Sequence, residues 1–158
     1  MTAVPEIAFG RIGFSHCAPV FLGTLVLGCS AAPGVASTEI IVPATDYAFQ
    51  IQRELPAGPA VFRLANQGRV PHELAVGRLK PGVTADSLLA FAAAGGDPGD
   101  LTDGVVGILI AGPGETSIGS LAVELSPGRT YMMICQFQDA DSLPPHVVLG
   151  MQAAFTVK

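Results

Sequence analysis

Short apolar segments recur along the chain, and most of them are followed by residues typical of turns. In the segment 60–66 (AVFRLAN), Phe62, Leu64 and Asn66 alternate with the side chains of the opposite face. The following Asn66-Gln67-Gly68 is turn chemistry, because Asn and Gly accept a positive φ. A period of two is typical of strands buried on one face. We predict strands at 39–43, 47–52, 60–66, 71–77, 105–110, 116–125, 130–137 and 147–157.

One segment has a different pattern. Residues 84–94 (TADSLLAFAAA) are rich in Ala and Leu and contain neither Gly nor Pro. Thr84 can cap the first turn, Asp86 lies in that turn, and Gly95-Gly96 supplies a stop. We therefore predict a helix over 84–94 and a surface loop over 95–104.

These elements predict an all-β domain in which two antiparallel sheets pack as a sandwich, with one short inserted helix. The 19 Gly and 13 Pro residues fit many short elements joined by turns. A hydrophobic share of 49% excludes disorder as the main state. The net charge of −5 argues against nucleic acid, because few cations are present to neutralise phosphates, and it favours basic or neutral partners.

The N-terminal part predicts export. Residues 12–38 carry no charged side chain, and the apolar run 19–28 has the length of a secretory signal core. The sequence ending at Cys29 resembles the motif at which bacterial lipoproteins are lipidated. Cleavage after Val35-Ala36 and an uncleaved membrane tether are the alternatives.

The predicted organisation is therefore an export signal over 1–29, a flexible spacer over 30–38 and a folded domain over 39–158. The domain is expected outside the cytoplasm, either in a periplasm or at the cell surface. Lipidation at Cys29 would anchor it to a membrane.

The exported domain keeps one thiol, Cys135, and a single thiol cannot form an internal disulfide. A free Cys in an oxidising compartment is a liability unless something occupies it. His72, His146 and Met151 complete a set of thiolate, two imidazoles and thioether. That set selects copper, with Met as a weak axial ligand.

The spacing of these residues suggests one site. Alternation over 130–137 turns Cys135 inward, and a loop of ten residues can return His146 beside it. Pro144 and Pro145 stiffen the end of that loop. Met151 is expected to begin the final strand, and His72 to come from a distant strand.

Residues 38–158 resemble the cupredoxins, the blue-copper β-sandwich family. The carriers of this resemblance are Pro71-His72-Glu73-Leu74, Tyr131-x-Met133-x-Cys135 and His146-Val147-Val148-Leu149-Gly150-Met151. The last segment is similar to the ligand loop of copper nitrite reductases. The resemblance implies a Greek-key sandwich and one type 1 copper ion held by His72, Cys135, His146 and Met151.

Two features depart from the family pattern. Glu73 stands where the family usually has an Asn whose contacts tie the two ligand segments together, and the loop from Cys135 to His146 is longer than in the small carriers. We expect Glu73 to be a solvated strand residue, and Asp139 and Asp141 to form a solvated face of the loop.

The leading hypothesis is one-electron transfer. Of the four ligands, His146 is expected to lie nearest the surface. The apolar residues around it form a rim on which we expect a redox partner protein to dock: Leu143, Pro144, Pro145 and Val147. Catalysis is not expected, because a second copper centre needs histidines that this domain lacks. Copper storage or delivery, or a metal-free binding module, is the alternative.

Overall fold

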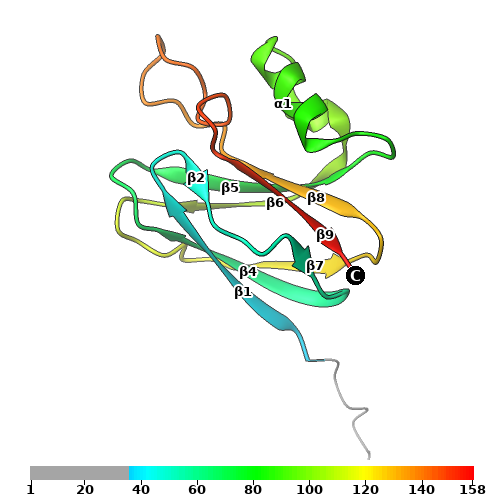
Figure 1. The fold of residues 1–158 in the computed structure, drawn as a ribbon. Helices are drawn as coiled ribbons and strands as arrows, with labels where there is room; N and C mark the ends of the chain where they lie inside the picture. The colour runs from blue at the N-terminus through cyan, green and yellow to red at the C-terminus, as the bar shows by residue number, and fades with distance from the viewer. Residues whose placement is uncertain (1–35) are drawn as a thin grey trace, which may run out of the picture. The chain divides into compact units, whose positions relative to one another are not determined.

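Nine strands form two sheets in the computed structural model, which describes residues 36–158 (Figure 1). The four-stranded sheet has the order β2-β1-β4-β7 and contains β1 (Thr38–Thr45), β2 (Ala48–Phe49), β4 (Gly58–Asn66) and β7 (Leu121–Leu125). The five-stranded sheet has the order β3-β9-β8-β5-β6 and contains β3 (Glu54–Leu55), β5 (His72–Leu79), β6 (Thr102–Ala111), β8 (Thr130–Ile134) and β9 (Gln152–Val157). The predicted all-β sandwich is confirmed.

The sequence suggested that both sheets are antiparallel, but two strand pairs are parallel. β1 pairs with β4 in parallel, and β3 pairs with β9 in parallel. The reason lies in the connection after β1. The chain makes the hairpin β1–β2 and then crosses to the other sheet, where it forms β3. It returns to the first sheet as β4, which lies beside β1 and runs in the same direction as β1.

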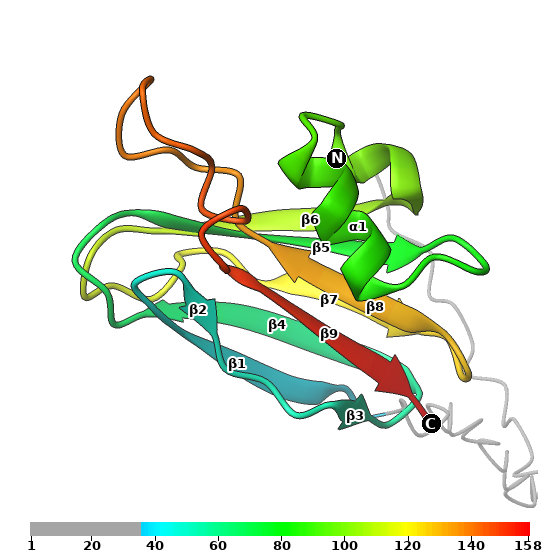
Figure 2. The same cartoon turned by 45° about the horizontal axis from the view of Figure 1, so that its top comes forward.

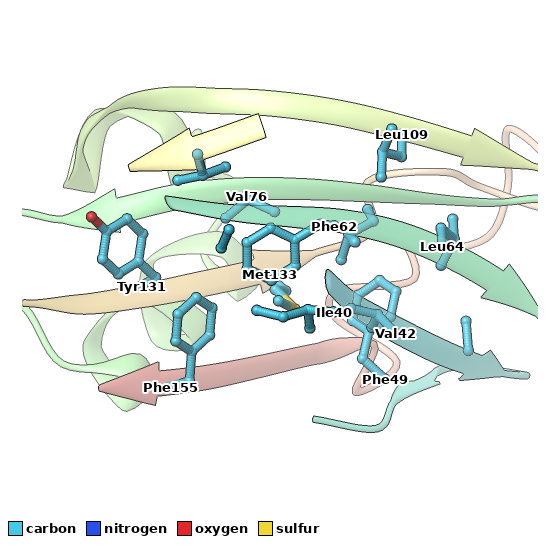
Figure 3. Close-up of a cluster of buried hydrophobic side chains, with 14 of the residues drawn as sticks. Ile40, Val42, Phe49, Phe62, Leu64, Val76, Leu109, Tyr131, Met133 and Phe155 are labelled. Carbon is cyan, nitrogen blue, oxygen red and sulfur yellow. The ribbon is translucent and has the colours of Figure 1, made fainter. Parts of the chain in front are cut away.

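Alternation along the strands builds the core between the sheets. Phe62 and Leu64 of β4 face Met133 of β8 and Phe155 of β9 across the sandwich (Figure 3). The rings of Phe155 and Tyr131 stack with centroids 5.3 Å apart. Burying a side chain of this size stabilises the fold by about 1.5 to 3 kcal/mol.

A second cluster lies on the outer face of the five-stranded sheet, under the helix α1 (Ala85–Ala93) and the 3-10 helix η1 (Pro98–Leu101) (Figure 2). Leu88 of α1 packs there with Met132 and Ile134 of β8. We call this second cluster, which also contains Ala75, Leu79 and Val147, the outer cluster. Because apolar groups cover both of its faces, β5 is buried over most of its length.

The predicted helix is confirmed, with Thr84 as its N-cap. The Ser87 N–H donates to Thr84 Oγ1 at 3.1 Å, and the Thr84 N–H donates to Ser87 Oγ at 3.0 Å. The predicted loop over 95–104 is wrong in part. Pro98 starts η1, and β6 already begins at Thr102.

Several strands are shorter than predicted. β7 begins only at Leu121, the segment 47–52 contributes only β2, β8 ends at Ile134 and β9 begins at Gln152. After β8 and before β9, backbone groups form hydrogen bonds outside the expected strand pairing. The Val148 N–H donates to the Pro145 carbonyl at 2.9 Å, so a turn takes the place of the expected strand start.

The predicted export signal 1–29, Cys29 and most of the spacer 30–38 lie outside the described residues and stay predictions. Within residues 36–158, no helix has the length and apolar character needed to span a bilayer.

Candidate metal centre

Three potential metal donors converge at one end of the sandwich. His72 begins β5, Cys135 follows β8 directly, and His146 lies in the loop before β9. Cys135 Sγ lies 3.4 Å from His146 Nδ1, and His72 Nδ1 lies 3.3 Å from the same nitrogen. The donor atoms of the three side chains all lie within 4.8 Å of one another. All three residues are buried.

The pairing of β5 with β8 brings the first two donors together. The strands are antiparallel, with Ala75 opposite Ile134, so the end of β8 reaches Cys135 beside the beginning of β5. Glu73 then joins the two segments twice. Its N–H donates to Cys135 Sγ at 3.4 Å, and its Oε1 accepts the Gln136 N–H at 2.7 Å.

The expectation that Glu73 is solvated is therefore wrong: the residue is 9% exposed. Its carboxylate accepts an N–H from the segment that carries the thiol, and this contact ties the two ligand segments. Its partner lies 63 residues further along the chain, so no local pattern indicates the contact.

Backbone hydrogen bonds fix the loop that carries His146. The His146 N–H donates to the Phe137 carbonyl at 2.8 Å, and the Val147 N–H donates to the Cys135 carbonyl at 2.7 Å. The loop therefore closes against the segment after β8, and the imidazole lies beside the thiol.

Met151 is attached to the same segment. Its carbonyl accepts the Cys135 N–H at 3.2 Å, and its own N–H donates to the His146 carbonyl at 2.9 Å. Its side chain is fully buried in the same cluster as Cys135. The axial role expected for its sulfur stays a prediction.

The second nitrogen of His146 is held by a side chain. His146 Nε2 lies 3.0 Å from Asp139 Oδ1, and the Tyr47 hydroxyl donates to Asp139 Oδ2 at 2.5 Å. The Tyr47 ring lies edge-on to the imidazole, with centroids 5.0 Å apart.

His146 is buried beneath Tyr47 and Asp139, with 1% of it exposed against 0% for His72 and Cys135. Asp139 is exposed, as expected for a loop residue. Both of its carboxylate oxygens also make hydrogen bonds within the site. Sequence reasoning missed Tyr47 altogether. Its participation depends on a contact with a residue 92 positions away, which no local pattern indicates.

His72 is held differently. Its Nδ1 faces His146, whereas its buried Nε2 has no hydrogen-bond partner among the described residues. Gly68 makes room for this ring edge, because a Cβ at that position would lie 3.0 Å from His72 Nε2.

The metal-free site disfavours charge. Burial raises the pKa of the Cys135 thiol, although the backbone N–H groups of Glu73 and Phe137 act in the opposite direction. Burial also lowers the pKa of His72, and the neighbouring His146 adds to that effect. A bound cation would reverse the balance for the thiol, because a metal-ligating thiol is deprotonated.

The spacing of the donors fits a single ion. In zinc sites, the metal lies about 2.0 to 2.1 Å from an imidazole nitrogen and about 2.3 Å from a thiolate sulfur. Around a tetrahedral ion these lengths place two nitrogens roughly 3.3 Å apart, and a sulfur and a nitrogen roughly 3.5 Å apart. The observed 3.3 Å and 3.4 Å agree. One thiolate and two imidazoles suit a borderline-soft transition-metal ion.

Comparison with known proteins supports the fold. Neither a protein-family model nor a curated protein matches the chain. Among solved structures, reduced auracyanin from Roseiflexus castenholzii is 20% identical with a TM-score of 0.51, and covers 78% of this chain and 99% of its own. Auracyanin B is 22% identical with a TM-score of 0.52, and covers 80% and 93%.

A third similar structure carries the most explicit description. Auracyanin A, described as a "blue" copper protein from Chloroflexus aurantiacus, is 19% identical with a TM-score of 0.50, and covers 78% of this chain and all of its own. At this level of identity the likeness concerns the fold alone. The chain has the fold of the cupredoxins, the β-sandwich of the blue copper proteins.

Proposed function

We propose that the protein binds one copper ion through His72, Cys135 and His146, with Met151 as a fourth ligand, and carries single electrons. The observation that carries the proposal is a buried cluster in which His146 Nδ1 lies 3.4 Å from Cys135 Sγ and 3.3 Å from His72 Nδ1, with all three donor atoms within 4.8 Å of one another. The similar solved structures support it, since one is described as a blue copper protein.

Copper, when bound, supplies a one-electron change between Cu(I) and Cu(II). The chain supplies a fixed set of donors. The hydrogen bonds between the Cys135 and His146 segments hold the soft donor and one imidazole in place. The pairing of β5 with β8 holds the other imidazole. A site that keeps its geometry in both metal states needs little rearrangement when an electron enters or leaves.

Catalysis by this chain is not part of the proposal. Outside the predicted export signal the sequence has two histidines, and both lie in the site described above. A second copper centre would require further histidines, so electron transfer fits the donor inventory better than turnover.

We further propose that a redox partner docks on the loop that carries His146. Leu143, Val148 and Leu149 are large apolar side chains that this loop exposes. Val147, which we had placed in the docking rim, is buried in the outer cluster and is unavailable. The net charge of −5 favours a partner whose docking face is basic or neutral.

Export and anchoring at Cys29 complete the proposal. An uncharged segment over 12–38 supports the first, and the lipoprotein-like motif supports the second. Cell fractionation of the full chain and of Cys29→Ala tests them. Release of the variant from the membrane fraction supports anchoring, whereas equal membrane association of both forms contradicts it.

Redox cycling of the copper-loaded protein tests the function. We expect reversible uptake and release of one electron per chain without loss of metal. Copper that binds in equimolar amount but cannot cycle would indicate storage or delivery. Failure to bind copper would leave a metal-free binding module.

A further inference from the structure

The outer nitrogen of His146 is held by Asp139, and Asp139 is held in turn by Tyr47 from a separate loop. Asp139 comes from the loop between Cys135 and His146, and Tyr47 comes from the turn between β1 and β2. Together they cover an imidazole that would otherwise face solvent. We call this pair the clamp.

The backbone at Tyr47 is unusual. Its φ is +65°, and within the described part of the chain it is the one residue other than glycine with a positive φ. A bulky residue rarely adopts this conformation, and it persists where the surroundings impose it. Here the result is that the Tyr47 hydroxyl reaches Asp139 Oδ2.

The same turn is fixed from its other residue. Asp46 accepts the Arg69 N–H at 2.7 Å and pairs with Arg69 Nε at 2.7 Å. Arg69 adjoins Gly68, which packs on His72. The two-residue turn is thus anchored beside one histidine while it reaches over the other.

We propose that Asp139, held by Tyr47, is a positioning residue for His146 that also biases the site toward the more highly charged metal state. This inference rests on the proposed copper site. A carboxylate that accepts the Nε2–H fixes the tautomer with Nδ1 as acceptor, and it raises the basicity of the ligating nitrogen. Its negative charge stabilises Cu(II) more than Cu(I), so it lowers the reduction potential.

Tyr47 has a distinct part in the clamp. Its hydroxyl orients the carboxylate and withdraws some of its negative charge. Removing the hydroxyl should therefore shift the potential opposite to removing the charge.

The main test compares Asp139→Asn with Asp141→Asn. Asp141 is an exposed acidic residue of the same loop, so it matches the change in net charge. We expect Asp139→Asn to weaken Cu(II) binding about 10- to 100-fold, with a smaller effect on Cu(I), and so to raise the potential. Asp141→Asn should leave the potential near the parent value. Equal potentials for the two variants would overturn the proposal.

Two further variants guard against a structural artefact. Tyr47→Phe should lower the potential by less than Asp139→Asn raises it, and Asp139→Glu should restore much of the parent value. A loss of packing alone would move Tyr47→Phe and Asp139→Asn in the same direction. That outcome would contradict the clamp.

A metal-free readout separates this inference from the proposed function. In the metal-free protein, nitrogen NMR should show His146 with its proton on Nε2, and Asp139→Asn should weaken that preference. If the parent protein binds no copper but shows this tautomer, the copper proposal fails and the positioning role survives. If the parent binds and cycles copper, but Asp139→Asn changes neither the His146 tautomer nor the reduction potential, the positioning role of Asp139 is wrong while the copper proposal stands.

Discussion

The two histidines of the site are held by different means. His72 belongs to a strand paired on both sides, with β6 and β8, and its Nε2 has no hydrogen-bond partner in residues 36–158. His146 belongs to a loop, and its Nε2 is held by Asp139, whose other carboxylate oxygen accepts the Tyr47 hydroxyl. The sheet fixes the first through its backbone, and side-chain hydrogen bonds fix the second.

This difference indicates how such a site is made rigid at the end of a sandwich. A strand residue inherits its position from backbone pairing and needs only a suitable cavity. A loop residue needs added contacts, and those contacts are also the ones that can alter the metal's properties. Changes near His72 should therefore appear mainly in stability, whereas changes near His146 should appear mainly in the behaviour of the metal.

The largest stability effect is expected at Asn66, which supports the His72 side. Its side chain donates to the Val70 carbonyl at 2.8 Å and to the Ala111 carbonyl at 3.1 Å, and it accepts the Gly68 N–H at 2.8 Å. Asn66→Ala should lower the free energy of unfolding by about 2 to 4 kcal/mol, because each buried group left unpaired costs about 1 to 3 kcal/mol. Urea unfolding measures this loss.

Gln67→Ala is the matched control for that experiment, because this neighbouring side chain is exposed. It should change the stability by less than about 0.5 kcal/mol. If Asn66→Ala were as mild as the control, the His72 side would not depend on this turn.

A smaller effect is expected at Glu73, the tie between β5 and the Cys135 segment. Glu73→Leu keeps much of the volume but leaves the partly buried Gln136 N–H without its acceptor. It should cost about 1.5 to 3 kcal/mol, the range for hydrogen bonds to charged groups. Glu73→Gln keeps an acceptor oxygen and should lose less. Urea unfolding measures the loss of stability in each variant. Equal losses in the two variants would contradict the role of Glu73 as a tie between the two segments.

The smallest effect is expected at Thr84, the N-cap of α1, whose side chain bonds within its own helix turn. Thr84→Ala removes the cap of α1 and should cost about 1 kcal/mol, whereas Thr84→Ser should retain most of the stability. Neither variant should alter the visible spectrum of the copper-loaded protein. A spectral change would show that α1 is coupled to the metal site. It would contradict the expectation that only changes near His146 alter the behaviour of the metal.

The sequence predicts the framework of the site well. Alternation along 130–137 turns Cys135 inward, and the structure indeed places Met133 and Cys135 in the core while Met132 and Ile134 join the outer cluster. Local patterns suffice here because a strand with two different faces must place each face consistently.

The hydrogen-bonded surroundings of the site could not be predicted in the same way. An apolar, proline-containing loop suggested that His146 lies nearest the surface, but it gave no sign that Tyr47 from another loop packs edge-on against the imidazole. Glu73 and Asp139 carry charges that suggest solvation, yet each finds a specific partner across a long interval of sequence. Such pairs depend on tertiary contacts and on one uncommon backbone angle, so neither periodicity nor composition indicates them.

The most direct test of the account is a Cu(II) titration of the protein and of its Cys135→Ser variant, followed by visible absorption. The account predicts an intense thiolate-to-copper charge-transfer band that saturates at one copper per chain and is lost in the variant. Absence of the band in the unmodified protein, or its persistence in Cys135→Ser, would contradict the assignment of this cluster as a copper site.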